Sequence, residues 1–180
     1  MSKTVREKIL ETANNVIAEK GLSHFTLETV AQEASVSKGG LLYHFPNKES
    51  LIENLIEGYT NQFNYRVNDN ISQIDNPVSY DFLRVFIEES FEQLEIDKNI
   101  TMGLLAAVSS NRELLNPMTE FNNEWQRIIE RTNDPELATI IRLATDGLIY
   151  SELFQINVIS DEMRNRVLAR LLKLAEENCK

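Results

Sequence analysis

The stretch that decides the fold covers residues 26–51 and reads TLETVAQEASVSKGGLLYHFPNKESL. Thr26 can cap a short helix that ends at about residue 34, and Ser37 can cap another that ends near Phe45. Ser35-Val36 supplies the turn between them. Two short helices joined by a tight turn predict a helix-turn-helix.

A supporting helix is expected before this pair. Apolar residues recur at helical spacing from Val5 to Ile17, and Gly21 follows Lys20 as a C-terminal stop. The pattern predicts a first helix over about residues 3–20. It completes a three-helix domain over residues 1–46, which is closed by Pro46.

The second helix of the pair opens on Lys38-Gly39-Gly40. Each glycine in a helix interior costs about 1 kcal/mol relative to alanine. That cost makes sense if the start of the helix must approach another backbone closely, as in a DNA groove, where its N–H groups also favour phosphate. The alternative is a loop with no helix before Leu41.

Charge is distributed unevenly along the chain, whose formal net charge is −10. Residues 1–48 hold six Lys and Arg against five Glu, a balance of +1, so the remaining 132 residues carry 12 basic and 23 acidic groups, a balance of −11. No acid occurs from Ala34 to Lys48. Tyr43, His44 and Lys48 add a hydroxyl, an imidazole and an ammonium to this stretch, a set suited to phosphate oxygens. The segment predicted to meet DNA is therefore spared the acidity of the rest.

The remainder of the chain predicts further helices over about 47–70, 77–94, 97–109, 114–131, 135–155 and 160–177. No strand of any length is favoured. The expected fold class is all-α, with about nine helices.

The last two of these helices are apolar over more of their circumference than a monomer needs. Paired with their copies in a second chain, they would form a four-helix bundle on a two-fold axis. The alternative is burial by other helices of the same chain. The apolar positions are Leu137, Ile140, Ile141, Ala144, Leu148, Ile149, Met163, Val167, Leu168, Leu171, Leu172 and Leu174.

The segments TLETVA from Thr26, VSKGGLLYHF from Val36 and NKESL from Asn47 together resemble the N-terminal signature of TetR-family regulators. The resemblance covers about residues 5–55. Residues 144–148, ATDGL, also resemble one branch of the C-terminal domains of this family. The resemblance implies a homodimeric DNA-binding repressor that a small-molecule effector releases from a palindromic operator. It further implies that residues 47–180 form the helical effector-binding and dimerisation domain.

The resemblance also implies which residues contact DNA. Gly40 stands where many members have Thr or Asn, and Leu42 stands where Tyr is common, so fewer polar base contacts are expected than in other members. Leu42 can still offer an apolar contact to a thymine methyl group. The implied contact residues are Thr26, Ser37, Lys38, Gly39, Gly40, Leu42, Tyr43, His44 and Lys48.

An effector would bind in an apolar cavity of the C-terminal domain. Asp146, on an otherwise apolar helix, could meet a polar or cationic group of the ligand, cap a kink beside Gly147 or form a hydrogen bond across the dimer axis. For each aromatic candidate the alternative is a plain core position. The candidates are Phe63, Phe86, Phe91, Met102, Phe121, Trp125, Asp146 and Tyr150.

Other function classes fit poorly. A di-iron carboxylate enzyme needs Glu-x-x-His pairs, but Gly21 and Leu41 stand three residues before the two histidines, His24 and His44. No phosphate loop, zinc-ligand spacing or nucleophile elbow occurs, so we expect no enzyme, metal or cofactor. The sequence has no run of about 18 apolar residues that would span a membrane. With one cysteine, Cys179, a reduced cytoplasmic protein is expected. The remaining rival is a helical ligand-binding or protein-interaction module that has lost DNA binding.

Overall fold

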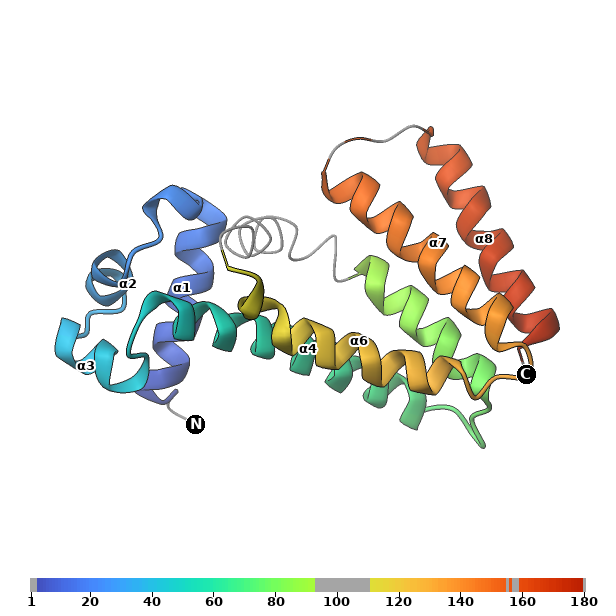
Figure 1. The fold of residues 1–180 in the computed structure, drawn as a ribbon, viewed down its shortest axis with the longest axis horizontal. Helices are drawn as coiled ribbons and strands as arrows, with labels where there is room; N and C mark the ends of the chain where they lie inside the picture. Colours follow the sequence, from blue (N-terminus) through green and yellow to red (C-terminus); the bar gives the residue numbers. More distant parts are fainter. Residues whose placement is uncertain (1–2, 93–110, 155, 157–158, 180) are drawn as a thin grey trace. The chain divides into compact units, whose positions relative to one another are not determined.

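The computed structural model describes residues 3–92, 111–154, 156 and 159–179, and all regular structure in them is helical (Figure 1). The predicted all-α class is therefore confirmed for the described residues, whereas the helix expected over 97–109 lies outside them. The elements are α1 (Val5–Lys20), η1 (Leu22–His24), α2 (Leu27–Glu33), α3 (Lys38–His44), α4 (Lys48–Ser72), an unlabelled helix over residues 79–92, η2 (Arg112–Leu115), α6 (Asn116–Ile129), α7 (Pro135–Leu153) and α8 (Asp161–Asn178). Within the described residues, no helix is long and apolar enough to cross a membrane.

The described residues fall into two compact units. The N-terminal unit holds those up to Thr60 and those from 111 to Thr119, and the C-terminal unit holds those from Asn61 to 92 and from Glu120 onward. The helix α4 runs without a break from the first unit into the second.

The N-terminal unit starts with a helix that is fixed at both ends. Thr4 and Glu7 form a reciprocal capping box at the start of α1, and Gly21, at φ +75°, ends it. The buried face of α1 packs with α2, α3 and the first turns of α4 in one apolar core. Fully buried members of this core include Ile9, Ala13, Phe25, Val30, Leu41, Phe45 and Leu51.

The turn of the helix-turn-helix is a hydrogen-bonded C-cap of α2. The Ser35 N–H donates to the Gln32 carbonyl and the Val36 N–H donates to the Ala31 carbonyl, both at 3.0 Å. Ser35 lies in the left-handed region at φ +55°. This pair of bonds around a left-handed residue is the Schellman motif, which is most often built on glycine.

The C-terminal unit is a bundle of the second part of α4, residues 79–92, the later turns of α6, and α7 and α8, which run side by side (Figure 1). The Asp134 side chain accepts the Leu137 N–H at 3.0 Å and Pro135 opens α7. Ser160 caps α8 through the Met163 N–H at 3.2 Å. These local signals explain why both helices begin where the sequence predicts.

Candidate nucleic-acid interface

The third helix begins at its glycines. Ser37 caps α3 by accepting the Gly40 N–H at 3.0 Å, and the helix runs from Lys38 to His44. The alternative of a loop before Leu41 is therefore wrong. The reason is that the Ser37 hydroxyl satisfies a first-turn N–H and offsets part of the cost of the glycines.

The packing of the described protein does not require a glycine at Gly39. A Cβ added to Gly39 would meet no atom within 4 Å, and one added to Gly40 would meet only the Ser37 Oγ, at 3.2 Å. Gly39 therefore weakens α3 without letting another part of the described chain come closer, whereas Gly40 leaves room for the capping Ser37 hydroxyl. An external body that approaches the start of α3 would explain Gly39.

The two faces of α3 differ sharply. Leu41 and Phe45, the next residue in the chain after the helix, are fully buried, whereas Tyr43 is 85% exposed. Gly39 lies four residues before Tyr43, so it shares that face, and it is exposed too. The His44 ring meets the Tyr43 ring edge to face, with centroids 5.1 Å apart. Leu42 is only partly exposed, which limits the apolar contact that it can offer a base.

The flanking candidates cap or precede neighbouring helices. The Thr26 Oγ1 accepts the Thr29 N–H at 3.1 Å at the start of α2, and the Thr26 side chain is exposed. Lys48, the first residue of α4, lies with its Nζ 5.2 Å from the centroid of the Phe25 ring, an arrangement that attracts the cation. Among the described residues, no carboxylate lies within ion-pair distance of Lys48.

The acid-free run from 34 to 48 is not free of acid in space. The Lys38 ammonium donates a hydrogen bond to the Glu28 carboxylate on the first turn of α2. This hydrogen bond is the main reason why the pKa of Glu28 lies below its usual value. Glu28 precedes Lys38 by ten residues, so no spacing rule within one helix identifies the contact. In the sequence, only the predicted helix-turn-helix indicated the contact between Glu28 and Lys38, because this motif brings the starts of α2 and α3 together.

Four of the predicted effector residues form one aromatic cluster in the C-terminal unit. Phe63, Phe86, Phe121 and Trp125 meet at centroid distances from 4.8 to 6.4 Å, and the Trp125 Nε1 donates to the Asn64 Oδ1 at 2.9 Å. A packed core alone would show the same contacts, so the assignment of these rings to an effector site stays a prediction.

Of the other effector candidates, Phe91 belongs to the same apolar core as these rings, whereas Tyr150 lies near the end of α7. Phe91 is buried beneath the Arg164 guanidinium, whose carbon lies 4.9 Å from the ring centroid. Tyr150 is 49% exposed and stacks on Phe154. Met102 lies outside the described residues.

Asp146 faces a buried arginine that sequence reasoning missed. The Arg142 guanidinium donates to the Asn122 Oδ1 at 2.7 Å and to the Gln126 Oε1 at 3.0 Å, and its Nε lies 3.9 Å from the Asp146 Oδ2. Burial raises the pKa of Asp146, and Arg142 partly opposes this effect. An arginine four residues before an aspartate on an apolar helix was the available signal.

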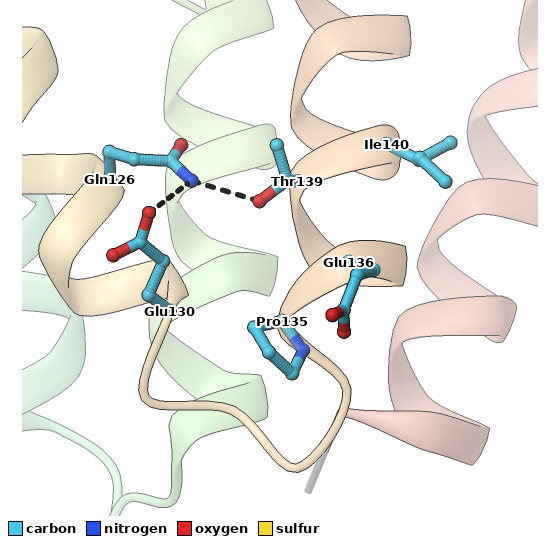
Figure 2. A pocket seen from close by; sticks show the side chains of 6 residues that line it. All are labelled: Gln126, Glu130, Pro135, Glu136, Thr139 and Ile140. Atoms are coloured by element: carbon cyan, nitrogen blue, oxygen red, sulfur yellow. Dashed lines mark hydrogen bonds between the residues drawn. The ribbon is translucent and has the colours of Figure 1, made fainter.

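An open groove of about 720 Å³ lies between the end of α6 and the start of α7. Figure 2 shows the Gln126 Nε2 reaching Thr139 of α7 across this groove, at 2.9 Å, and Glu130 on its own side of the groove, at 3.1 Å. Pro135, Glu136 and Ile140 complete the lining. No predicted effector residue is among these six.

A second exposed feature is an apolar row along α7, here called the α7 stripe. It consists of Ile140, Leu143, Gly147, Tyr150 and Phe154, the last directly after the helix. Ile140 and Leu143 are 61% and 62% exposed, and Phe154 is 46% exposed. The spacing of three and four residues places these positions on one side of the helix. Sequence reasoning named Ile140 but missed Leu143, Tyr150 and Phe154 as outward-facing members.

Two family models match the chain. "Bacterial regulatory proteins, tetR family" matches residues 9–55, and "Tetracyclin repressor-like, C-terminal domain" matches residues 81–176, more than half of the chain.

The curated relatives are transcriptional repressors. The biofilm operon icaADBC HTH-type negative transcriptional regulator IcaR of Staphylococcus epidermidis is 28% identical over 130 residues, which cover 72% of this chain and 66% of that protein. The HTH-type transcriptional repressor KstR2 of Mycobacterium tuberculosis is 31% identical over 90 residues, which cover 50% and 44%. The chain thus spans less than two thirds of the length of either relative.

Solved structures share the fold over nearly the whole chain. A TetR-family regulator from Rhodococcus sp. matches with a TM-score of 0.73 at 21% identity, covering 95% of this chain and 98% of its own. The multidrug binding protein EbrR complexed with ethidium matches with a TM-score of 0.62 at 25% identity, covering 93% and 98%. With both family models and this fold in agreement, the chain belongs to the TetR family of bacterial transcriptional regulators, not to a family of enzymes.

Proposed function

We propose that this protein is a DNA-binding transcriptional repressor that reads duplex DNA with α3. The observation that carries the proposal is the start of α3, where Gly39, with open space around it, lies on the same face as the exposed Tyr43. DNA binding is assigned to residues 1–46, and effector binding and dimerisation to residues 47–180.

The contacts divide by chemistry. Ser37, Lys38, Gly39 and Gly40 enter the major groove, where backbone N–H groups and the Lys38 ammonium meet base edges and phosphates. Leu42 adds an apolar contact. Thr26, Tyr43, His44 and Lys48 bind phosphates and set the register of the protein on DNA.

The proposed homodimer is supported by the α7 stripe. Four large exposed apolar side chains, with a glycine between the second and the third, suit a helix that packs closely on its own copy. Two copies related by a two-fold axis would present two α3 helices to a palindrome, at a spacing of about 34–36 Å. The second copy also explains why α7 carries more apolar surface than its own unit buries.

A small molecule is proposed to release the dimer from DNA by binding the C-terminal unit. EbrR, a fold relative, is described as a multidrug binding protein in complexes with ethidium and malachite green. In this chain the aromatic cluster, with Arg142 over the Phe86 ring at 5.7 Å, offers both apolar and polar contacts to an effector. The effector acts only to the extent that it prefers the state in which the two α3 helices no longer match the operator.

The test is the anisotropy of a labelled random duplex, titrated with the protein over a range of salt concentrations. DNA binding through α3 predicts affinity that falls steeply as salt rises, together with a loss of affinity in Tyr43→Ala. The matched control is Tyr65→Ala, which removes a tyrosine that is 72% exposed on α4. Absent or salt-independent binding would favour an interaction module, and an equal loss in both variants would remove α3 from the interface.

A further inference from the structure

Lys38, the cation at the start of the recognition helix, is paired within the protein. Its ammonium binds the Glu28 carboxylate, and both side chains remain open to solvent, with 59% and 64% of their surface exposed. Glu28 lies two residues after Thr26 and reaches Lys38, the residue after Ser37. It therefore stands between the proposed DNA contacts at the starts of α2 and α3.

At this position, Glu28 and DNA compete for the charge of Lys38. A base edge or phosphate that approaches the Lys38 ammonium competes with Glu28 for its charge, because the carboxylate accepts one of its three N–H donors and lies beside the other two. The carboxylate then remains beside the DNA backbone, where like charge is unfavourable. DNA binding through Lys38 therefore weakens a pair that the unbound protein makes, and Glu28 gains no new partner in exchange.

We infer that Glu28 restrains DNA binding by holding Lys38, so that it sets the affinity of the repressor for duplex DNA. The inference rests on the proposed function. It identifies Glu28 as a positioning residue that acts through Lys38 and makes no favourable contact of its own with DNA. A restraint of this kind lowers the differential affinity that an effector must supply to release the protein.

The chain offers a matched control on the same helix. Glu33, at the end of α2, forms an equivalent exposed pair with Lys20 at 2.5 Å, and no proposed DNA contact is part of that pair. Glu28→Gln and Glu33→Gln each remove one negative charge from α2. Only Glu28→Gln releases a lysine at the start of α3.

The experiment measures the affinity of four variants for a labelled random duplex at several salt concentrations: Glu28→Gln, Glu33→Gln, Lys38→Ala and Glu28→Gln with Lys38→Ala. We expect Glu28→Gln to bind about two- to five-fold more tightly than the unaltered protein, the range that an exposed ion pair can supply. Its salt dependence should also be steeper, because a released lysine displaces a counterion from DNA. Glu33→Gln should stay close to the unaltered protein, and the gain should vanish when Lys38 is absent.

Three results would overturn the inference. They are an unchanged or weaker Glu28→Gln, an equal gain in Glu33→Gln, and a gain that persists without Lys38, which would make it plain charge repulsion. Thermal unfolding of each variant checks that these exposed substitutions leave the fold intact. If the unaltered protein binds no duplex at all, the proposed function itself is wrong. If it binds DNA in a salt-sensitive way and Glu28→Gln has no effect, only the inferred role of Glu28 is wrong.

Discussion

Lys48 provides the sharpest quantitative test of the DNA-binding face, because its ammonium rests on the Phe25 ring and, among described residues, no acid pairs with it. Replacing it with methionine keeps an apolar stem over that ring but removes the charge. Loss of the cation–ring attraction costs about 0.5–1 kcal/mol at an exposed site. A sulfur–ring contact offsets part of this cost. Lys48→Met should therefore fold with nearly unchanged stability.

The DNA affinity should change in a defined way. Each phosphate contact contributes about 0.9 to the slope of log affinity against log salt, so two copies of Lys48 in a dimer contribute about 1.8. Between 50 and 200 mM salt, the unaltered protein should then lose about twelve-fold more affinity than Lys48→Met. Because a phosphate contact carries no sequence information, operator and scrambled duplexes should be affected alike.

The assay is a salt series of fluorescence-anisotropy titrations on both duplexes. Lys173→Met on α8, a residue with 61% of its side chain exposed, serves as the control for the loss of one surface charge. A slope equal to that of the unaltered protein would show that Lys48 touches no phosphate. A larger effect on the operator than on the scrambled duplex would make it a base contact instead.

Four further predictions concern other parts of the molecule. Leu143→Glu, on the α7 stripe, should halve the mass measured by light scattering while Val5→Glu, an exposed apolar control on α1, leaves it unchanged; a dimer that survives Leu143→Glu would place the interface elsewhere. Lys38→Ala should weaken operator binding more than random binding, and equal losses on the two duplexes would remove Lys38 from sequence reading. Ser35→Val, at φ +55°, should lower the free energy of unfolding by about 1–2 kcal/mol in urea titrations, because a branched side chain is strained there. Ser35→Gly should not lower it, and equal stabilities of the two variants would argue against the left-handed turn. Trp125→Ala should cost about 3–5 kcal/mol of unfolding free energy, since Trp125 is 4% exposed and contacts three aromatic rings, and a loss below about 1 kcal/mol would contradict that packing.

The helices of the N-terminal unit were predictable because their signals are local. Ser37 and Thr26 cap the helices that they precede, and Gly21 ends α1 where predicted. Each of these residues acts on backbone groups within a few positions of itself, so its effect can be read without knowing the fold. The left-handed Ser35 was not predictable, since serine rarely takes a place that usually needs glycine.

Side-chain contacts between helices could not be predicted from the sequence, because they depend on residues far apart in the chain. The acid-free run suggested a bare cationic surface, but Glu28 reaches Lys38 from another helix. The side chain of Arg142 is almost fully buried although it carries a charge, because Asn122 and Gln126 of α6 accept its hydrogen bonds. Such partners are fixed only when helices pack.

The predicted effector residues show that a periodic apolar pattern does not distinguish a core from a ligand cavity. Apolar residues at helical spacing mark the inward face of a helix, whether that face closes a core or lines a cavity. Phe63 and Trp125 meet edge to face in the cluster, as rings in a core also do. Their role in effector binding therefore stays a prediction.

Selection of bound fragments from the genome of the source organism, followed by footprinting, tests the central claim most directly. Reading of DNA by two α3 helices predicts a two-fold symmetric site, with half-sites separated by about one helical turn or a multiple of it. Enrichment of that site over other fragments should fall in Lys38→Ala, which alters a proposed base contact, and persist in Lys173→Met. If no fragment is enriched, or if the unaltered protein and Lys38→Ala enrich the same fragments equally, α3 is not the element that recognises DNA.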